Sequence, residues 1–203
     1  MIGIIDYGSG NLRSVSNALR REGAEVSLIG SPRQLETVQA VVLPGVGAFG
    51  DCVRNLRERD LWDALRLWIE SGRRFLGICL GYQVLFESSE ETPGAAGFGF
   101  FRGSVRRFKE NGLKVPHMGW NTLSLTPPAN PLWRGLPADP SVFFVHSYFP
   151  VPEDASIVTS RATYGETFAA SVAKDNVAAV QFHPEKSQDV GLTILRNFVA
   201  SVS

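Results

Sequence analysis

The first half of the chain alternates short, continuous apolar runs with longer segments in which apolar residues recur every three or four positions. Continuous runs of this length are typical of strands buried on both faces of a sheet, and the three-to-four spacing is typical of amphipathic helices. Their alternation predicts a parallel sheet with helices on both faces. The expected strands cover residues 2–6, 24–29, 40–44 and 74–79, and the expected helices cover residues 11–23 and 60–72.

After Gly94 the pattern changes to a series of short, strand-like segments separated by turns. The pair Asp175-Asn176 is typical of a turn between two of these strands, and helical spacing returns from about Val190. We therefore expect one α/β domain over residues 1–203, with a central, mostly parallel or mixed sheet flanked by helices. The expected strands of this half lie within residues 103–108, 113–125, 141–149, 155–165, 167–175 and 177–184.

Composition narrows the class of protein. Hydrophobic residues make up 44% of the chain and charged residues 20%, which is typical of a folded globular protein. The formal net charge is zero, which argues against a general nucleic-acid or anionic-membrane binder. No apolar run reaches the roughly 18 residues that a membrane-spanning helix needs, and no secretory signal follows Met1. With only two cysteines, the composition favours a cytoplasmic protein with reduced thiols.

Cys79 lies between two glycines in the segment GICLG, after an expected buried strand and before a helical run, YQVLFE. This is the strand–nucleophile–helix context of a nucleophile elbow, with cysteine in place of serine. The residues two before and two after such a nucleophile must be small, because strand and helix nearly touch, and Gly77 and Gly81 meet this need. The alternative is a buried cysteine that ends a core strand. For Cys52, within a helical pattern, we expect only such a structural role.

A thiol nucleophile needs a base, and the chain has three histidines, His117, His146 and His183. His183 ends an expected strand, and Glu185 follows it after a single proline. Side chains two apart in extended chain project to the same side, so Glu185 can hold one imidazole nitrogen and leave the other for Cys79. The HPE segment alone is also explained by a turn at a strand end. Together with the cysteine elbow it predicts a catalytic triad.

The segment PGVGAFG has the Gly-x-Gly-x-x-Gly spacing of a dinucleotide-binding loop in Gly45, Gly47 and Gly50. It follows the third expected strand rather than the first, and the acidic residue about twenty positions on falls inside a helical pattern, so we reject dinucleotide binding. The other interpretation is a backbone wall of Gly45, Val46 and Gly47 beside the elbow. Glycine permits peptide orientations that point N–H groups at an oxyanion, together with the N–H of Leu80. A plain turn stays open as an alternative.

Three segments, PGVG, GICLGYQVLF and HPEKS, occur in this order along the chain. In order and spacing they resemble the triad-type, class-I glutamine amidotransferases. The segments IDYGSGNLRSV, FESSEE and PHMGWN resemble, more narrowly, the glutaminase subunits of imidazole glycerol phosphate synthase, an enzyme of histidine biosynthesis. The resemblance covers essentially the whole chain and implies a flavodoxin-like fold. We expect neither a cofactor nor a metal ion.

The resemblance also implies a reaction. Cys79 attacks the side-chain amide of L-glutamine, His183 transfers protons and Glu185 orients His183, so that ammonia leaves, a γ-glutamyl thioester forms and water then releases glutamate. The positions that match the glutamine-binding residues of the family are Gln83, Glu91, Ser147, Tyr148 and Lys186.

A partner is implied as well. In the subfamily that the chain resembles, the glutaminase forms a heterodimer with a (β/α)8-barrel synthase subunit, which receives the ammonia through an internal tunnel. The positions that match this interface are Asn11, Trp120 and Asn121. Trp120, flanked by polar or small residues, also fits an exposed aromatic anchor on the residues alone, although a core position on a strand explains it equally well.

Other functions stay open on the sequence alone. One is the glutaminase of another synthase, such as one that makes pyridoxal phosphate, although DYGSGN and HPEKS disfavour it. Another is a cysteine hydrolase on a related elbow fold, which predicts turnover of peptides or esters without glutamine. A third is a non-catalytic subunit that retains only the scaffold, against which the intact set of Cys79, His183 and Glu185 argues.

Overall fold

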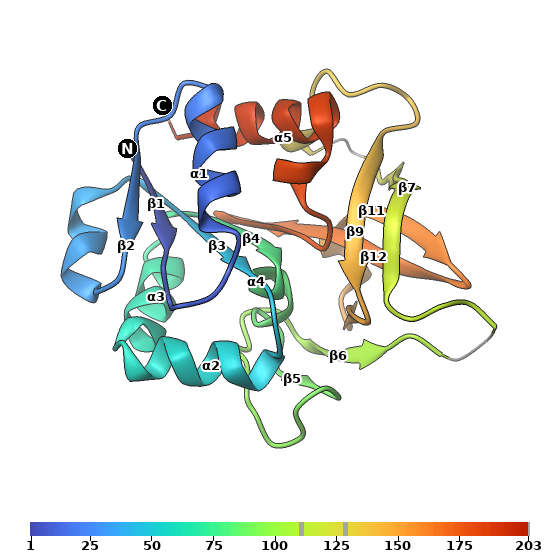
Figure 1. The fold of residues 1–203 in the computed structure, drawn as a ribbon, viewed down its shortest axis with the longest axis horizontal. Coiled ribbons are helices and arrows are strands. Elements are labelled where there is room, and N and C mark those ends of the chain that lie inside the picture. The colour runs from blue at the N-terminus through green and yellow to red at the C-terminus, as the bar shows by residue number, and fades with distance from the viewer. Residues whose placement is uncertain (110–111, 128–129, 203) are drawn as a thin grey trace.

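The central sheet of the molecule draws its strands from both halves of the chain (Figure 1). The computed structural model describes residues 1–109, 112–127 and 130–202, and within these the sheet has eight strands in the order β2-β1-β3-β4-β13-β12-β11-β8. Strands β2, β1, β3, β4 and β13 are parallel, and β12, β11 and β8 are added in antiparallel pairs. The bounds are β1 Ile2–Ile5, β2 Val26–Ile29, β3 Ala40–Gly45, β4 Arg74–Cys79, β8 Ser124–Leu125, β11 Val158–Tyr164, β12 Glu166–Lys174 and β13 Val177–Val180.

Helices cover both faces of this sheet. One face packs against α1 (Leu12–Arg21) and α5 (Gln188–Ala200), and the other against α2 (Phe49–Glu58) and α3 (Leu61–Glu70) (Figure 1). Neighbouring residues of β1 divide accordingly between two apolar clusters, Ile4 with side chains of α1 and α5, and Ile5 with those of α2 and α3. Successive strand residues point to opposite faces, so a sheet covered on both sides requires the continuous apolar runs seen in the sequence. None of the described helices is long and apolar enough to cross a membrane.

Two smaller sheets accompany the central one. One has three strands in the order β10-β6-β5, and the other pairs β7 with β9 in antiparallel register. Their bounds are β5 Ser88–Ser89, β6 Gly103–Arg107, β7 His117–Thr122, β9 Ser141–His146 and β10 Tyr148–Pro152, and short 3-10 turns cover η1 Pro32–Thr37, η2 Pro131–Trp133, η3 Ala155–Ile157 and η4 Pro184–Lys186. Only Ser147 separates β9 from β10, so the two small sheets meet at this residue.

The expected fold class is confirmed as one α/β domain with a large mixed sheet flanked by helices. The four strands expected in the first half are present, and a turn at Asp175-Asn176 joins β12 to β13. The C-terminal helix begins two residues earlier than its apolar spacing indicates, at Gln188.

The run after Cys79 departs from the expected helix. α4 (Leu80–Gln83) is a single turn, and the chain leaves helical geometry after Val84. The carbonyl groups of the three residues that follow α4 accept hydrogen bonds from the backbone of residues 98–101 instead of from a next helical turn. These long-range bonds satisfy the backbone and outweigh the helical pattern of the side chains.

Candidate active site

Cys79 stands at a sharp turn between the end of β4 and the start of α4. Its backbone has φ 55° and ψ −105°, a conformation that non-glycine residues rarely adopt and that persists only where the surroundings impose it. Direct contact explains both flanking glycines: a Cβ on Gly81 would lie 1.8 Å from the carbonyl oxygen of Leu43, and one on Gly77 would lie 2.6 Å from that of Gly81. Strand and helix therefore touch as a nucleophile elbow demands.

His183 and Glu185 lie just after β13, at the 3-10 turn η4. The Nδ1 atom of His183 is 2.8 Å from Oε1 of Glu185, and the two side chains are 2% and 1% exposed. The carboxylate accepts the proton of Nδ1, which leaves Nε2 for another partner. Nε2 is buried and makes no hydrogen bond within the described chain.

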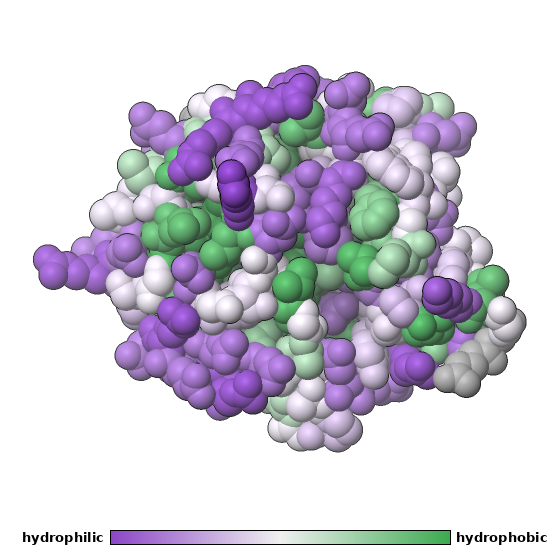
Figure 2. Space-filling view, in the orientation of Figure 1, coloured by the Kyte–Doolittle hydropathy of each residue, from purple (hydrophilic) through white to green (hydrophobic). Residues whose placement is uncertain are grey.

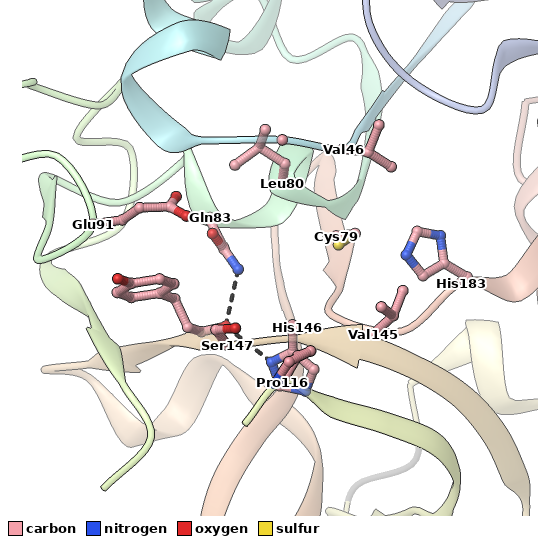
Figure 3. Close-up of a pocket in the computed structure, with 12 residues that line it drawn as sticks. Val46, Cys79, Leu80, Gln83, Glu91, Pro116, Val145, His146, Ser147 and His183 are labelled. Atoms are coloured by element: carbon pink, nitrogen blue, oxygen red, sulfur yellow. Dashed lines mark hydrogen bonds between the residues drawn. The ribbon is translucent and has the colours of Figure 1, made fainter. Parts of the chain in front are cut away.

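The Cys79 side chain lies beside the His183 ring (Figure 3). Burial alone would lower the pKa of His183, but its interactions with Cys79 and with Glu185 outweigh burial and raise that pKa to about 10. The ring is therefore protonated near neutral pH, and an imidazolium stabilises a neighbouring thiolate. The structure thus brings the three predicted triad residues together in an arrangement that suits nucleophilic attack.

A cavity of about 290 Å³ opens over the sulfur, near the small end of the range for small-molecule sites. In Figure 3, Gln83 and Glu91 lie to one side of Cys79 and His183 to the other. The lining residues are Val46, Gly47, Cys79, Leu80, Gln83, Glu91, Pro116, Val145, His146, Ser147, Tyr148 and His183. The lining combines apolar walls with a few polar groups, as a site for a small polar molecule does.

Four of the five predicted substrate-binding residues line this cavity, and the fifth, Lys186, is exposed outside its lining. The Nε2 atom of Gln83 donates to the carbonyl oxygen of Tyr148 at 3.0 Å and to Gln181 Oε1 at 3.2 Å. Since both bonds use the nitrogen, the Gln83 group left for a ligand is its Oε1 acceptor. Glu91 Oε2 accepts from the backbone N–H that begins α2 at 2.8 Å, and burial raises the pKa of this carboxyl.

The glycine loop runs alongside the elbow. Gly45 is paired with Cys79 in the β3–β4 register, and Val46, Gly47 and Leu80 line the cavity. Gly47 has φ 103°, which favours glycine. The Val46 carbonyl accepts a 2.8 Å hydrogen bond from the hydroxyl group of a residue in the N-terminal loop, Ser9. The loop is thus close enough to supply backbone N–H groups to a reacting carbonyl, and it is held from outside the cavity.

The predicted interface residues differ in their surroundings. Trp120 is 47% exposed on β7, and Met118, on the same side of the strand, is 64% exposed. Asn11 is the N-cap residue of α1 and is partly exposed. The side-chain amide of Asn121 is engaged within the chain, where its Nδ2 donates to the carbonyl oxygen of Thr163 at 2.9 Å.

Two polar features of the site escaped sequence reasoning. Gln181 is fully buried beside Cys79, with its Nε2 donating to Sγ at 3.7 Å. Its signal was present, because it lies two residues before His183 in extended chain and so points to the same side. The other feature is the contact between the buried side chains of His117 and His146. The two residues lie in separate strands, so no local sequence pattern predicts this contact. Within the described residues, no group of three or more His, Cys, Asp or Glu side chains is arranged to hold a metal ion.

Comparison with known proteins decides the family. The model of the class-I glutamine amidotransferases matches residues 3–202, nearly the whole chain. The chain belongs to this family. This amidotransferase is 54% identical over 203 residues to imidazole glycerol phosphate synthase subunit HisH of Thermosynechococcus vestitus, covering 99% of this chain and 97% of the relative. It is 51% identical over 204 residues to subunit HisH of Syntrophotalea carbinolica, covering 98% of each chain.

Solved structures share the fold of this amidotransferase. A crystal structure described as a glutamine amidotransferase aligns over 99% of this chain and 98% of its own length, with a TM-score of 0.74 and 24% identity. The structure of PurLQS from Thermotoga maritima aligns over 100% of this chain and 98% of its own matched chain, with a TM-score of 0.78 and 20% identity. At these identities the likeness concerns the fold.

Proposed function

We propose that this amidotransferase is the glutaminase subunit of an imidazole glycerol phosphate synthase and hydrolyses L-glutamine to glutamate and ammonia. The observation that carries the chemistry is that the strained Cys79 and His183 line one cavity, with the buried Glu185 bound to Nδ1 of His183. The assignment to this synthase is supported by relatives named HisH that are about half identical over nearly the full length.

In the first step, the Cys79 thiolate attacks the carbonyl carbon of the glutamine side chain. The protonated Nε2 of His183 gives its proton to the leaving nitrogen, the carbon–nitrogen bond breaks, and ammonia departs. The product on the enzyme is a γ-glutamyl thioester. Glu185 keeps the proton of Nδ1 in place and offsets the charge of the imidazolium.

In the second step, neutral His183 takes a proton from a water molecule, whose oxygen attacks the thioester carbonyl. The carbon–sulfur bond breaks, glutamate is released and Cys79 returns as a thiolate next to the imidazolium. Both steps pass through an oxyanion on the same carbonyl oxygen. The N–H of Leu80 and those of the Gly45–Gly47 loop beside the elbow are the proposed donors that stabilise it.

The polar lining supports glutamine as the substrate. Glu91 and the free Oε1 of Gln83 are acceptors on the side of the cavity away from His183, where they suit a protonated α-amino group (Figure 3). Ser147 and Tyr148 line the same cavity and complete a site for an amino acid. Lys186 is exposed outside the lining of the cavity, so a contact with the substrate's carboxylate requires movement of η4 or of the side chain.

A (β/α)8-barrel synthase subunit is the proposed partner, and it receives the ammonia. The exposed side chains of Met118 and Trp120 on β7 support a docking surface there, since large apolar residues at such exposure are favourable anchors for another protein. Figure 2, in the orientation of Figure 1, shows apolar residues with hydrophilic residues among them on the face turned to the viewer. We also propose that the complex works in the cytoplasm, where Cys79 stays reduced.

The test is glutamate release from L-glutamine by the purified chain, alone and with a cognate barrel subunit carrying its nucleotide ligand. We expect low activity alone and a large increase with the liganded partner. High glutaminase activity of the chain without the barrel subunit would support the glutaminase activity, but it would contradict activation by this partner. Selective binding to a pyridoxal phosphate synthase barrel would reassign the pathway, and no glutamate in either condition would remove the activity.

A further inference from the structure

Gln181 is a fully buried polar residue in direct contact with the proposed nucleophile. It lies between the end of β13 and His183, and its Nε2 donates to Sγ of Cys79 at 3.7 Å. A buried amide is unfavourable unless its donors and acceptor find partners. The sulfur atom is the partner of the amide nitrogen.

A chain of hydrogen bonds fixes which end of this amide faces the sulfur. Gln83 Nε2 donates to the Tyr148 carbonyl oxygen, and the Nδ1 atom of His146 lies 2.9 Å from the same oxygen. Because Gln83 presents its nitrogen to Gln181 as well, the Gln181 atom opposite must be the oxygen. Gln181 therefore turns its N–H group toward Cys79, and it can rotate away only by breaking this chain.

We propose that Gln181 stabilises the Cys79 thiolate and holds the sulfur in line with the substrate amide, as an N–H donor that acts in addition to the neighbouring His183. This role rests on the proposed function, in which Cys79 is the nucleophile. An N–H group binds an anionic sulfur more strongly than a neutral one. The bond weakens when the sulfur becomes part of the thioester and is restored when the thiolate leaves, so Gln181 favours both the resting thiolate and its departure in the second step.

Two variants test whether the N–H group of Gln181 stabilises the thiolate. Gln181→Met keeps the length and burial of the side chain without an N–H group, and Gln181→Glu keeps its shape but places a carboxyl group against the sulfur. The rate at which iodoacetamide alkylates Cys79 is followed from pH 5 to pH 10, with the modified peptide identified by mass spectrometry. We expect the half-maximal pH to rise by about one unit in Gln181→Met, and further in Gln181→Glu.

Turnover gives the second readout. In the complex with the liganded barrel subunit, Gln181→Met should lower kcat for glutamate release by about tenfold while KM stays within about threefold. That split follows because Gln83 keeps its bond to the Tyr148 carbonyl, so the substrate-binding wall is retained. A large rise in KM with unchanged kcat would assign Gln181 to the substrate pocket and overturn its action on the sulfur.

Ser171 supplies a matched control. Its hydroxyl is fully buried in β12, 2.6 Å from Oγ of Ser160, and it does not line the cavity. Ser171→Ala thus loses a buried hydrogen bond in a neighbouring strand and should leave the alkylation profile where it is in the wild type. Cys52 does not interfere below pH 10, because burial raises the pKa of its thiol to about 12.

Superimposable alkylation profiles for the wild type and Gln181→Met, or a shift no larger than that of Ser171→Ala, would overturn the proposal. Should Gln181→Met fail to fold by thermal unfolding, Gln181→Glu decides alone, with an upward shift in support and an unchanged profile against. If wild-type Cys79 reacts no faster than Cys52 at neutral pH, the nucleophile itself is wrong. That result would contradict both the proposed function and the role of Gln181. It differs from the outcome in which wild-type Cys79 is reactive but the Gln181 variants leave its alkylation profile unchanged.

Discussion

The Nδ1 atom of His117 lies 3.1 Å from the Nε2 atom of His146, and both side chains are buried. The nearby Tyr148 carbonyl can only accept, so His146 carries its proton on Nδ1, and its Nε2 accepts from His117. Both rings are neutral in this arrangement. Burial lowers the pKa of His117 to about 4 and that of His146 to about 3.

This pair predicts a loss of stability in mild acid. Unfolded histidines titrate near pH 6.5, whereas these two stay neutral in the folded state until about pH 4 and about pH 3. The unfolded chain therefore binds protons first, and stability that is present above pH 6.5 is lost as the pH falls. We expect each histidine to remove about 2 kcal/mol from the free energy of unfolding between pH 7 and pH 5, measured by urea denaturation.

The variant His117→Gln should show a shallower dependence on pH, because one of the two protonation sites is absent. A loss between pH 7 and pH 5 as large as that of the wild type would mean that carboxylates, rather than the histidine pair, cause it.

The close contact between Gly81 and the Leu43 backbone predicts a large effect of Gly81→Ala, because the Cβ of the new alanine has to displace that backbone. We expect the variant to unfold or to lose more than about 3 kcal/mol of its free energy of unfolding. Gly72→Ala is the control. Gly72 has φ 79° but nothing within 4 Å of an added Cβ, so this change should cost about 1 kcal/mol from backbone strain alone. Equal losses in urea denaturation would contradict the steric account of the elbow.

Within the triad, Glu185→Gln should be milder than His183→Ala. Glutamine can still accept the Nδ1 proton through its amide oxygen, so orientation is partly kept, whereas alanine removes the proton carrier. We expect kcat/KM for glutamate release by the complex to fall by about 10- to 100-fold in the first variant and by about 1,000-fold or more in the second. Similar losses would count against Glu185 as the residue that orients His183.

Replacing the nucleophile should separate the two half-reactions. Cys79→Ala removes glutamine-dependent synthesis by the complex, because no thioester can form, but leaves synthesis from added ammonia within about twofold of the wild type. The synthase product is measured with each nitrogen source. Loss of the ammonia-dependent reaction as well would show that Cys79 serves the partner's chemistry or the assembly of the complex.

The partner surface is tested by Trp120→Ala. Truncating an aromatic anchor should raise the dissociation constant of the complex by about 10- to 100-fold, measured by calorimetry. Leu67, 63% exposed on α3, provides the comparison, since its change to alanine also removes an exposed apolar side chain. If the two variants weaken binding equally, or neither does, β7 is not the docking surface.

The catalytic elbow could be predicted from the sequence because most of its constraints are local. Strain at Cys79 and the contact between Gly77 and Gly81 act within five residues and leave a readable spacing, whereas the contact of Gly81 with Leu43 comes from β3. The short α4 could not be predicted in this way, because the competing hydrogen bonds come from residues 98–101.

A contact with a distant strand and a local turn explain two further residues whose surroundings were not foreseen. The amide of Asn121, which matches an interface position of the family, is engaged by the Thr163 carbonyl from another strand. Lys186 shares a motif with His183 and Glu185, yet the 3-10 turn directs it to the surface. A motif specifies which residues are neighbours in the chain, and the turn that follows decides which of them face the site.

The adjacency of β4 and β13 bears on when the protein can first act. Residues 177–180 of β13 pair with residues 75–78 of β4, so the cysteine and its histidine come from segments about a hundred positions apart in the chain. A chain still emerging from the ribosome, or one cut before Val177, carries the thiol without the imidazole or the carboxylate. With Cys79, His183 and Glu185 in the roles proposed for them, glutamine hydrolysis is expected only after β13 has docked, and an unfinished chain is expected to release no ammonia.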